Sequence, residues 1–139
     1  MSYIVDASVA LKWVILEEHS EAARQLLIHD ALAAPELFWI ECANVLWAKA
    51  RRRQISVVDA RDGFDAIEAT PIATLPVRPL ARAAQAIALE LNQSAYDSLY
   101  LAAALAERCV LVTADEVFAS AARAHPVYAR SVRLLGTSV

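Results

Sequence analysis

The sequence is short of the residues that build several common kinds of ligand site. Glycine occurs only twice in 139 residues, as Gly63 and Gly136. Dinucleotide-binding turns and phosphate-binding loops each need several glycines, because the backbone must approach the ligand closely. The sequence therefore excludes both of these nucleotide sites.

Cysteine is also scarce. Cys42 and Cys109 stand alone, with no CxxC pair and no histidine nearby at metal-ligand spacing. Two isolated thiols in a chain with an α/β pattern indicate a reducing, cytoplasmic compartment rather than a disulfide framework. We interpret both as buried structural residues.

Long apolar runs and an excess of positive charge are missing as well. No stretch reaches the roughly 18 to 20 apolar residues of a membrane span, since Lys12, Glu17 and Glu18 interrupt the first apolar run. The N-terminus has no basic leader before an apolar core, so we expect no signal peptide and a soluble cytoplasmic protein. The formal net charge of −3 gives no overall positive field, and any nucleic acid must be held by a local patch.

The residues that are present predict one α/β domain. A chain of 139 residues with 58% hydrophobic residues has enough material for one sizeable core, so we take residues 1–139 as a single domain. Short apolar runs alternate with amphipathic stretches in the order βααβαα(β)ααβαβ, which predicts a central, mainly parallel sheet flanked by helices on both faces. The predicted strands are residues 3–5, 32–34, 72–77, 110–112 and 132–135. The predicted helices are residues 9–16, one from 20, 35–53, 56–70, 80–91, 96–107 and one shortly after 113.

Local signals predict where these helices begin. Ser8 is the expected start of the first helix, and Pro35 suits the first turn of the long third helix. The capping-box pattern, a serine or threonine followed three residues later by an acid, occurs at 56–59, 94–97 and 113–116.

Four acids lie in apolar surroundings, where an uncompensated charge is costly. Asp6 and Asp115 end short apolar strands, and the helix of Asp97 follows a crossover to the same edge of a parallel sheet, where ligands bind. Glu41 lies near the middle of an apolar helix. Carboxylates crowded together repel, and a divalent cation removes the conflict. Oxygen ligands favour Mg²⁺ or Mn²⁺ over Zn²⁺, which predicts phosphodiester or phosphate-ester hydrolysis.

Each acid also has a purely structural interpretation. Asp6 and Asp115 suit helix N-caps, and Asp97 suits the third residue of a capping box, where a carboxylate satisfies free amides. Glu41 is the hardest to explain in this way, because no cap is needed inside a helix. An exposed surface position is its structural alternative.

Four motifs together resemble the PIN-domain ribonucleases of the VapC toxin type, over about residues 2–135. They are Asp6-Ala-Ser8, Pro35-Glu36-x-Phe38-Trp39-x-Glu41-x-x-Asn44-x-Leu46, Tyr96-Asp97-x-x-Tyr100-x-Ala102 and Val112-Thr113-Ala114-Asp115. The resemblance implies a Mg²⁺-dependent endoribonuclease that is toxic to its own cell and neutralised by a small antitoxin.

The same resemblance assigns roles to individual residues. It makes Asp6, Glu41, Asp97 and Asp115 the acidic, metal-binding cluster, with Asp6 and Asp97 the first candidates for direct ligands. Ser8 and Asn44 fall on positions that help to orient the cluster. Such toxins often carry a basic residue shortly after the last aspartate, and here Glu116 and Val117 stand in its place.

Basic and aromatic residues predict contacts with other molecules. Lys49, Arg51, Arg52 and Arg53 form the densest positive run, which suits RNA phosphates and, equally, the dipole at the end of a helix. Trp13, Trp39 and Trp47 lie on helical segments and suit core or interface packing. With the high apolar fraction, they predict a homodimer and a groove for the antitoxin.

Two other functions remain open on the sequence alone. A Mg²⁺-dependent phosphatase or phospho-acceptor domain would use a similar sheet, although an aspartate-nucleophile phosphatase needs Asp-x-Asp where this chain has Ser8 in the third position. A non-catalytic module that only binds RNA or protein is the second alternative.

Overall fold

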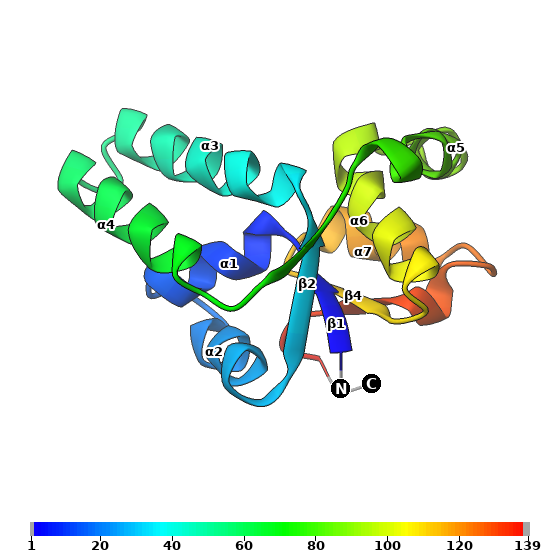
Figure 1. Cartoon of the computed structure of the whole chain (residues 1–139), viewed down its shortest axis with the longest axis horizontal. Coiled ribbons are helices and arrows are strands. Elements are labelled where there is room, and N and C mark those ends of the chain that lie inside the picture. The colour runs from blue at the N-terminus through cyan, green and yellow to red at the C-terminus, as the bar shows by residue number, and fades with distance from the viewer. Residues whose placement is uncertain (1, 138–139) are drawn as a thin grey trace.

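The computed structural model describes residues 2–137 and contains a five-stranded sheet whose four strand pairs are all parallel (Figure 1). The strand order is β3-β2-β1-β4-β5, so β1 lies at the centre. The strands are β1 (Ser2–Val5), β2 (Ala31–Pro35), β3 (Ala73–Leu75), β4 (Val110–Thr113) and β5 (Val132–Leu134). The predicted α/β class with a parallel sheet is confirmed.

Helices connect the strands in the predicted order. They are α1 (Ala7–Val14), α2 (Ser20–His29), α3 (Leu37–Arg51), α4 (Val57–Glu68), α5 (Ala81–Leu91), α6 (Ala95–Ala106) and α7 (Glu116–Arg123), with short 3-10 turns η1 (Arg78–Leu80) and η2 (Ala129–Ser131). Helix α6 packs on β1, β2 and β4, whereas α1 packs against α2, α3 and α4. The α3–α4 and α5–α6 pairs lie on opposite sides of the upper end of β2 in Figure 1.

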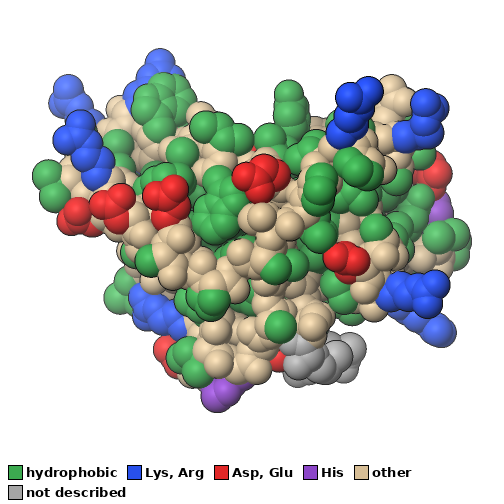
Figure 2. Space-filling model, in the orientation of Figure 1, with side chains coloured by type: hydrophobic (Ala, Val, Ile, Leu, Met, Phe, Trp, Pro, Cys, Tyr) green, Lys and Arg blue, Asp and Glu red, His purple; other side chains and the backbone are tan. Residues whose placement is uncertain are grey.

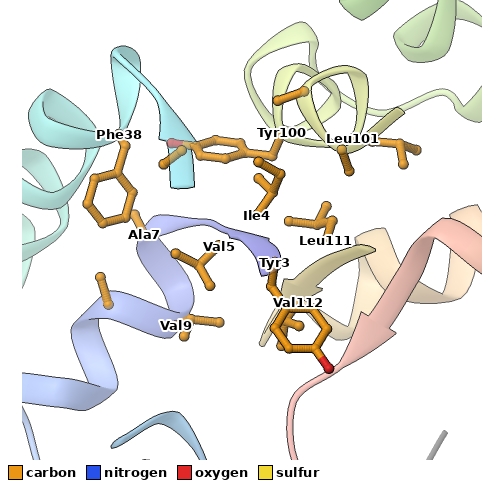
Figure 3. Packing of buried hydrophobic residues seen from close by; sticks show 14 of the residues in the cluster. Tyr3, Ile4, Val5, Ala7, Val9, Phe38, Tyr100, Leu101, Leu111 and Val112 are labelled. Atoms are coloured by element: carbon orange, nitrogen blue, oxygen red, sulfur yellow. The ribbon is translucent and has the colours of Figure 1, made fainter. Parts of the chain in front are cut away.

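The central strand is buried on both faces. Ile4 and Val5 are successive residues that point to opposite faces, and neither has any exposed surface. Ile4 lies among Tyr100, Leu101 and Leu111, whereas Val5 points toward α1 (Figure 3). This packing fixes the end of β1, and with it the position of the next residue, Asp6.

Two of the predicted capping boxes are confirmed and two helix starts were predicted wrongly. Ser56 and Ser94 cap α4 and α6 by accepting the backbone N–H of the residue three positions on. The first helix, however, is capped by Asp6 instead of Ser8, and the last by Asp115 instead of Thr113. Both hydroxyls bond to Asp6, and an aspartate that directly follows a strand is well placed to accept a first-turn amide.

Two boundaries involving proline also differ from prediction. Pro35 ends β2 instead of opening α3, which begins at Leu37. It lies beyond the residues of β2 that pair with β1, so its missing N–H removes no bond to that strand. Strand β3 is shorter than the predicted residues 72–77, because Pro76 cannot donate to the ladder.

The tryptophans and cysteines divide between core and surface. Trp13 is buried and donates to the carbonyl of Ala23, but Trp47 is 56% exposed. Cys42 is buried as predicted, whereas Cys109 is only partly buried. Within residues 2–137, no helix has both the length and the apolar character needed to cross a membrane.

Candidate functional site

The sheet has a topological switch point between β1 and β4. From β1 the chain continues to β2 and β3 on one side, and β4 and β5 lie on the other. Ligands of open α/β sheets bind at such a point, beyond the carboxyl ends of the strands. Asp6 follows β1 and Asp115 follows β4, so both acids flank this crevice.

Asp6 is held by three hydrogen bonds. Ser8 Oγ donates to Oδ1 at 2.5 Å, Thr113 Oγ1 donates to Oδ2 at 2.5 Å, and the N–H of Val9 donates to Oδ1 at 3.3 Å. Removal from water nevertheless raises the pKa of Asp6, with a further contribution from the charge of Asp115. The carboxylate is therefore fixed in place, but its hydrogen bonds do not fully offset the cost of burying its negative charge.

Ser8 and Thr113 join the two strand ends. Ser8 Oγ accepts the N–H of Ala114 at 2.9 Å, and Thr113 Oγ1 accepts the N–H of Asp115 at 3.1 Å. The predicted orienting role of Ser8 is consistent with these bonds. Thr113 was not predicted as a site residue, although a hydroxyl at the end of an apolar strand, two residues before an aspartate, is a recognisable signal.

Asp115 serves as a cap while facing the crevice. Its Oδ1 accepts the N–H of Phe118 at 3.0 Å, which opens α7. The structural interpretation of this residue is therefore correct. One carboxylate oxygen caps the helix, and the other is not required for that bond.

Glu41 reaches the site from the second turn of α3. Its Oε1 accepts a short hydrogen bond from the hydroxyl of Tyr100 on α6, and the side chain is partly buried. Burial raises the pKa of Glu41, and the charges of Asp97 and Asp6 add to the rise. Burial also raises the pKa of Tyr100, with the help of Glu41, so the phenol stays protonated and donates. Glu41 is not the exposed surface acid of the structural alternative.

Asp97 stands in the first turn of α6. Its N–H donates to Ser94 Oγ at 3.1 Å, as the capping box predicts. Burial raises the pKa of its carboxyl group, and the charge of Asp115 contributes. Asp97 therefore takes part in a helix start and is also affected by an acid that follows β4.

The four predicted acids influence one another through their charges. Asp115 acts on Asp6 and on Asp97, and Glu41 is affected by both Asp97 and Asp6. Such effects require short distances. The structure thus brings the four acids to the same end of the sheet, although they lie as far apart as positions 6 and 115 in the sequence.

The donor set suits a hydrated Mg²⁺ or Mn²⁺ ion. The side chains that bond to Asp6 offer oxygen, which hard cations prefer, and a cation would offset the repulsion between Asp6 and Asp115. Across residues 2–137, no three acidic, histidine or cysteine side chains are placed so that together they could hold an ion. In proteins Mg²⁺ is usually bound through one or two carboxylates, with waters completing its coordination.

The predicted RNA-binding residues lie at the other end of α3. Lys49 is partly buried, and Arg51, Arg52 and Arg53 are exposed. Arg51 is the last residue of α3 and lies about 15 Å along the helix from Glu41. The guanidinium of Arg51 lies over the ring of Trp47, 5.5 Å from its centroid. Basic side chains gather over this end of the α3–α4 pair in Figure 2, while acidic side chains occur closer to the middle of the same face.

An apolar groove begins beside Glu41. It has a volume of about 550 Å³ and lies between α3 and the start of α6. Asn44, one turn after Glu41, is exposed and lines it together with Ile40, Trp47 and Tyr96. These three large side chains are 56 to 65% exposed. A groove of this composition suits an apolar partner segment.

Residues 3–124 match the sequence model of the PIN domain. The match covers most of the chain. The protein therefore belongs to the PIN-domain family.

Within that family the chain is similar to the VapC ribonucleases. It is 35% identical over 112 residues to VapC ribonuclease Mb0985 of Mycobacterium bovis and to ribonuclease VapC9 of Mycobacterium tuberculosis, covering 81% of this chain and 84% of each relative. The chain is thus a member of the VapC group, and the predicted family resemblance is confirmed.

Solved structures share the fold. PAE2754 from Pyrobaculum aerophilum matches with a TM-score of 0.66 and 24% identity, covering 87% of this chain and 79% of that one. VapBC2 from Rickettsia felis, bound to a DNA fragment from its promoter, matches with a TM-score of 0.63 and 12% identity, covering 96% and 98%. At these identities the similarity concerns the fold alone.

Proposed function

We propose that the protein is a metal-dependent endoribonuclease, the toxin of a toxin–antitoxin pair. The observation that carries this proposal is the placement of Asp6 and Asp115 at the β1–β4 switch point, with Glu41 and Asp97 on the adjoining helices α3 and α6, in a chain 35% identical to VapC ribonucleases. The preferred cofactor is Mg²⁺, with Mn²⁺ as a substitute.

The four acids have two different proposed roles. Asp6 and Asp97 are the proposed direct ligands of the ion, and Glu41 and Asp115 complete its negative environment. The ion, when bound, polarises the phosphoryl oxygen and lowers the pKa of an attacking water. Ser8 and Thr113 keep the carboxylate of Asp6 in one orientation, and Asn44, one turn after Glu41 on α3, is a further candidate for orienting the cluster.

RNA binding would depend on the positive end of α3. Lys49, Arg51, Arg52 and Arg53 offer charge to the phosphate backbone. A strand that contacts them and the acids would run along α3. This placement offsets the net charge of −3, which otherwise repels RNA.

Two protein partners are proposed. The solved VapBC2 structure has a similar fold, and the apolar groove beside Glu41 suits a segment of a small antitoxin that would also cover the site. The exposed Trp47 and Ile40 also suit a homodimer contact. A sedimentation experiment that finds only monomer at micromolar concentration would contradict the dimer. We place the protein in the cytoplasm, with its RNA substrates.

The direct test is RNA cleavage by the purified protein. We expect cleavage with Mg²⁺ or Mn²⁺, none with a chelator, and none in Asp6→Ala or Asp97→Ala. Full activity in both variants would contradict the assignment. Cleavage of a phosphomonoester instead of RNA would favour the phosphatase, and RNA binding without cleavage would favour the interaction module.

A further inference from the structure

One hydrogen bond connects the two helices that carry acids of the site. The hydroxyl of Tyr100 on α6 donates to Oε1 of Glu41 on α3, 59 residues away in the sequence. Tyr100 follows Asp97 by three residues, so the two side chains neighbour each other along α6. The bond therefore connects Glu41 to the helix that positions Asp97.

The tyrosine is a rigid anchor. Its side chain is 1% exposed, and its ring lies beside Ile4 in the core (Figure 3). A ring packed in this way places its hydroxyl at a defined point. Glu41, in contrast, is a partly buried side chain with three rotatable bonds, and the charges of Asp97 and Asp6 repel it. Without the hydroxyl, repulsion would turn the carboxylate away from the other acids.

We propose that Tyr100 is a positioning residue of the site, whose hydroxyl holds the Glu41 carboxylate beside the other acids so that a divalent ion can bind. This inference rests on the proposed function. Tyr100 touches neither the ion nor the RNA in this role, and acts only through Glu41.

The chain offers a matched control. Tyr128 is also a buried tyrosine, 7% exposed, and its hydroxyl donates to Glu90 Oε2 at 2.8 Å, outside the site. Tyr100→Phe and Tyr128→Phe each remove one buried hydroxyl bound to a glutamate. A loss of Mn²⁺ affinity or activity that is common to both variants reflects an effect on folding. A loss confined to Tyr100→Phe reflects an effect on the site.

The first measurement is Mn²⁺ binding by calorimetry without RNA. We expect Tyr100→Phe to weaken binding about tenfold, as the loss of an outer-shell partner does, and Tyr128→Phe to bind as the wild type does. In RNA cleavage, the Mn²⁺ concentration for half-maximal rate should rise by a similar factor, with an unchanged KM for RNA. In a Glu41→Gln background, Tyr100→Phe should cause no further loss.

The outcomes are separable. Wild-type Mn²⁺ affinity in Tyr100→Phe would overturn this inference and leave the proposed function standing, whereas a wild-type protein that neither binds Mn²⁺ nor cuts RNA would overturn both. If Tyr100→Phe fails to fold, Glu41→Asp withdraws the carboxylate from the same hydroxyl by one methylene. Unchanged Mn²⁺ affinity in Glu41→Asp would then overturn the inference.

Discussion

The acids at the end of the sheet are held in two different ways. Asp6 and Asp115 follow strands, whose ends are tied together by Ser8 and Thr113. Glu41 and Asp97 are carried by helices on either side of the crevice, and each has one hydroxyl partner, Tyr100 or Ser94. The carboxylate of Asp6 accepts three hydrogen bonds, whereas that of Glu41 accepts one.

This difference indicates that the strand ends are the rigid part of the site. The position of Asp6 follows from a strand buried on both faces, so it is set as soon as the sheet forms. The position of Glu41 also depends on how α3 packs relative to α6. We therefore expect the loss of a hydroxyl partner on the strand side to lower activity more than the loss of a hydroxyl partner on the helix side.

The largest effect is expected from Asp6→Asn. The substitution keeps the shape of the side chain and removes the charge of a proposed metal ligand. RNA cleavage should fall more than about a hundredfold, because loss of an outer-shell partner alone costs about 10- to 100-fold. Asp59→Asn, at an exposed acid of α4, is the control and should cleave normally. Comparable activity in the two variants would contradict a role for Asp6.

The second prediction compares the two sides directly. Thr113→Val keeps the shape of a side chain with no exposed surface and removes the hydroxyl that serves Asp6 and Asp115. Cleavage should fall about 10- to 100-fold, more than in Tyr100→Phe. Thr70→Val, whose hydroxyl only donates to the carbonyl of Ile67, is the control. A smaller loss of cleavage in Thr113→Val than in Tyr100→Phe would contradict the view that the strand ends are the more rigid part of the site.

The same comparison explains what the sequence could predict. Asp6 and Asp115 were proposed because an apolar run stops at or just before each of them, and Asp97 because its helix follows a crossover to the same end of the sheet. Tyr100 and Thr113 stand in the motifs but were given no role in the site, since their partners Glu41 and Asp6 lie 59 and 107 residues away in the sequence. Ser8 and Thr113 do not cap α1 and α7 for a related reason, because each of them bonds to Asp6 and to the end of the other strand.

A third prediction concerns stability and pH. The pKa of Asp6 is raised above its ordinary value of 3.8 in the folded protein. At a pH between the ordinary and the raised pKa, the folded state therefore binds more protons than the unfolded state. Wild-type stability should therefore fall as the pH rises from about 3.8 through the raised pKa, and Asp6→Asn lacks this loss. In metal-free thermal unfolding, the Tm of the variant relative to the wild type should increase with pH. If the Tm difference between Asp6→Asn and the wild type stays constant or decreases as the pH rises, the hydrogen bonds to Asp6 fully stabilise its charge.

The smallest effect is expected far from the strand-borne and the helix-borne acids, at the basic end of α3. Arg52→Ala removes an exposed charge, so RNA affinity should fall a few-fold at low salt, and the slope of log affinity against log salt should decrease by about 0.7 for one lost phosphate contact. The rate at saturating RNA should not change, because the acids are untouched. Arg108→Ala is the control, since this exposed arginine precedes β4 and so lies at the amino ends of the strands, away from the acids. If Arg52→Ala lowers only the Tm, its charge serves the helix dipole instead of RNA.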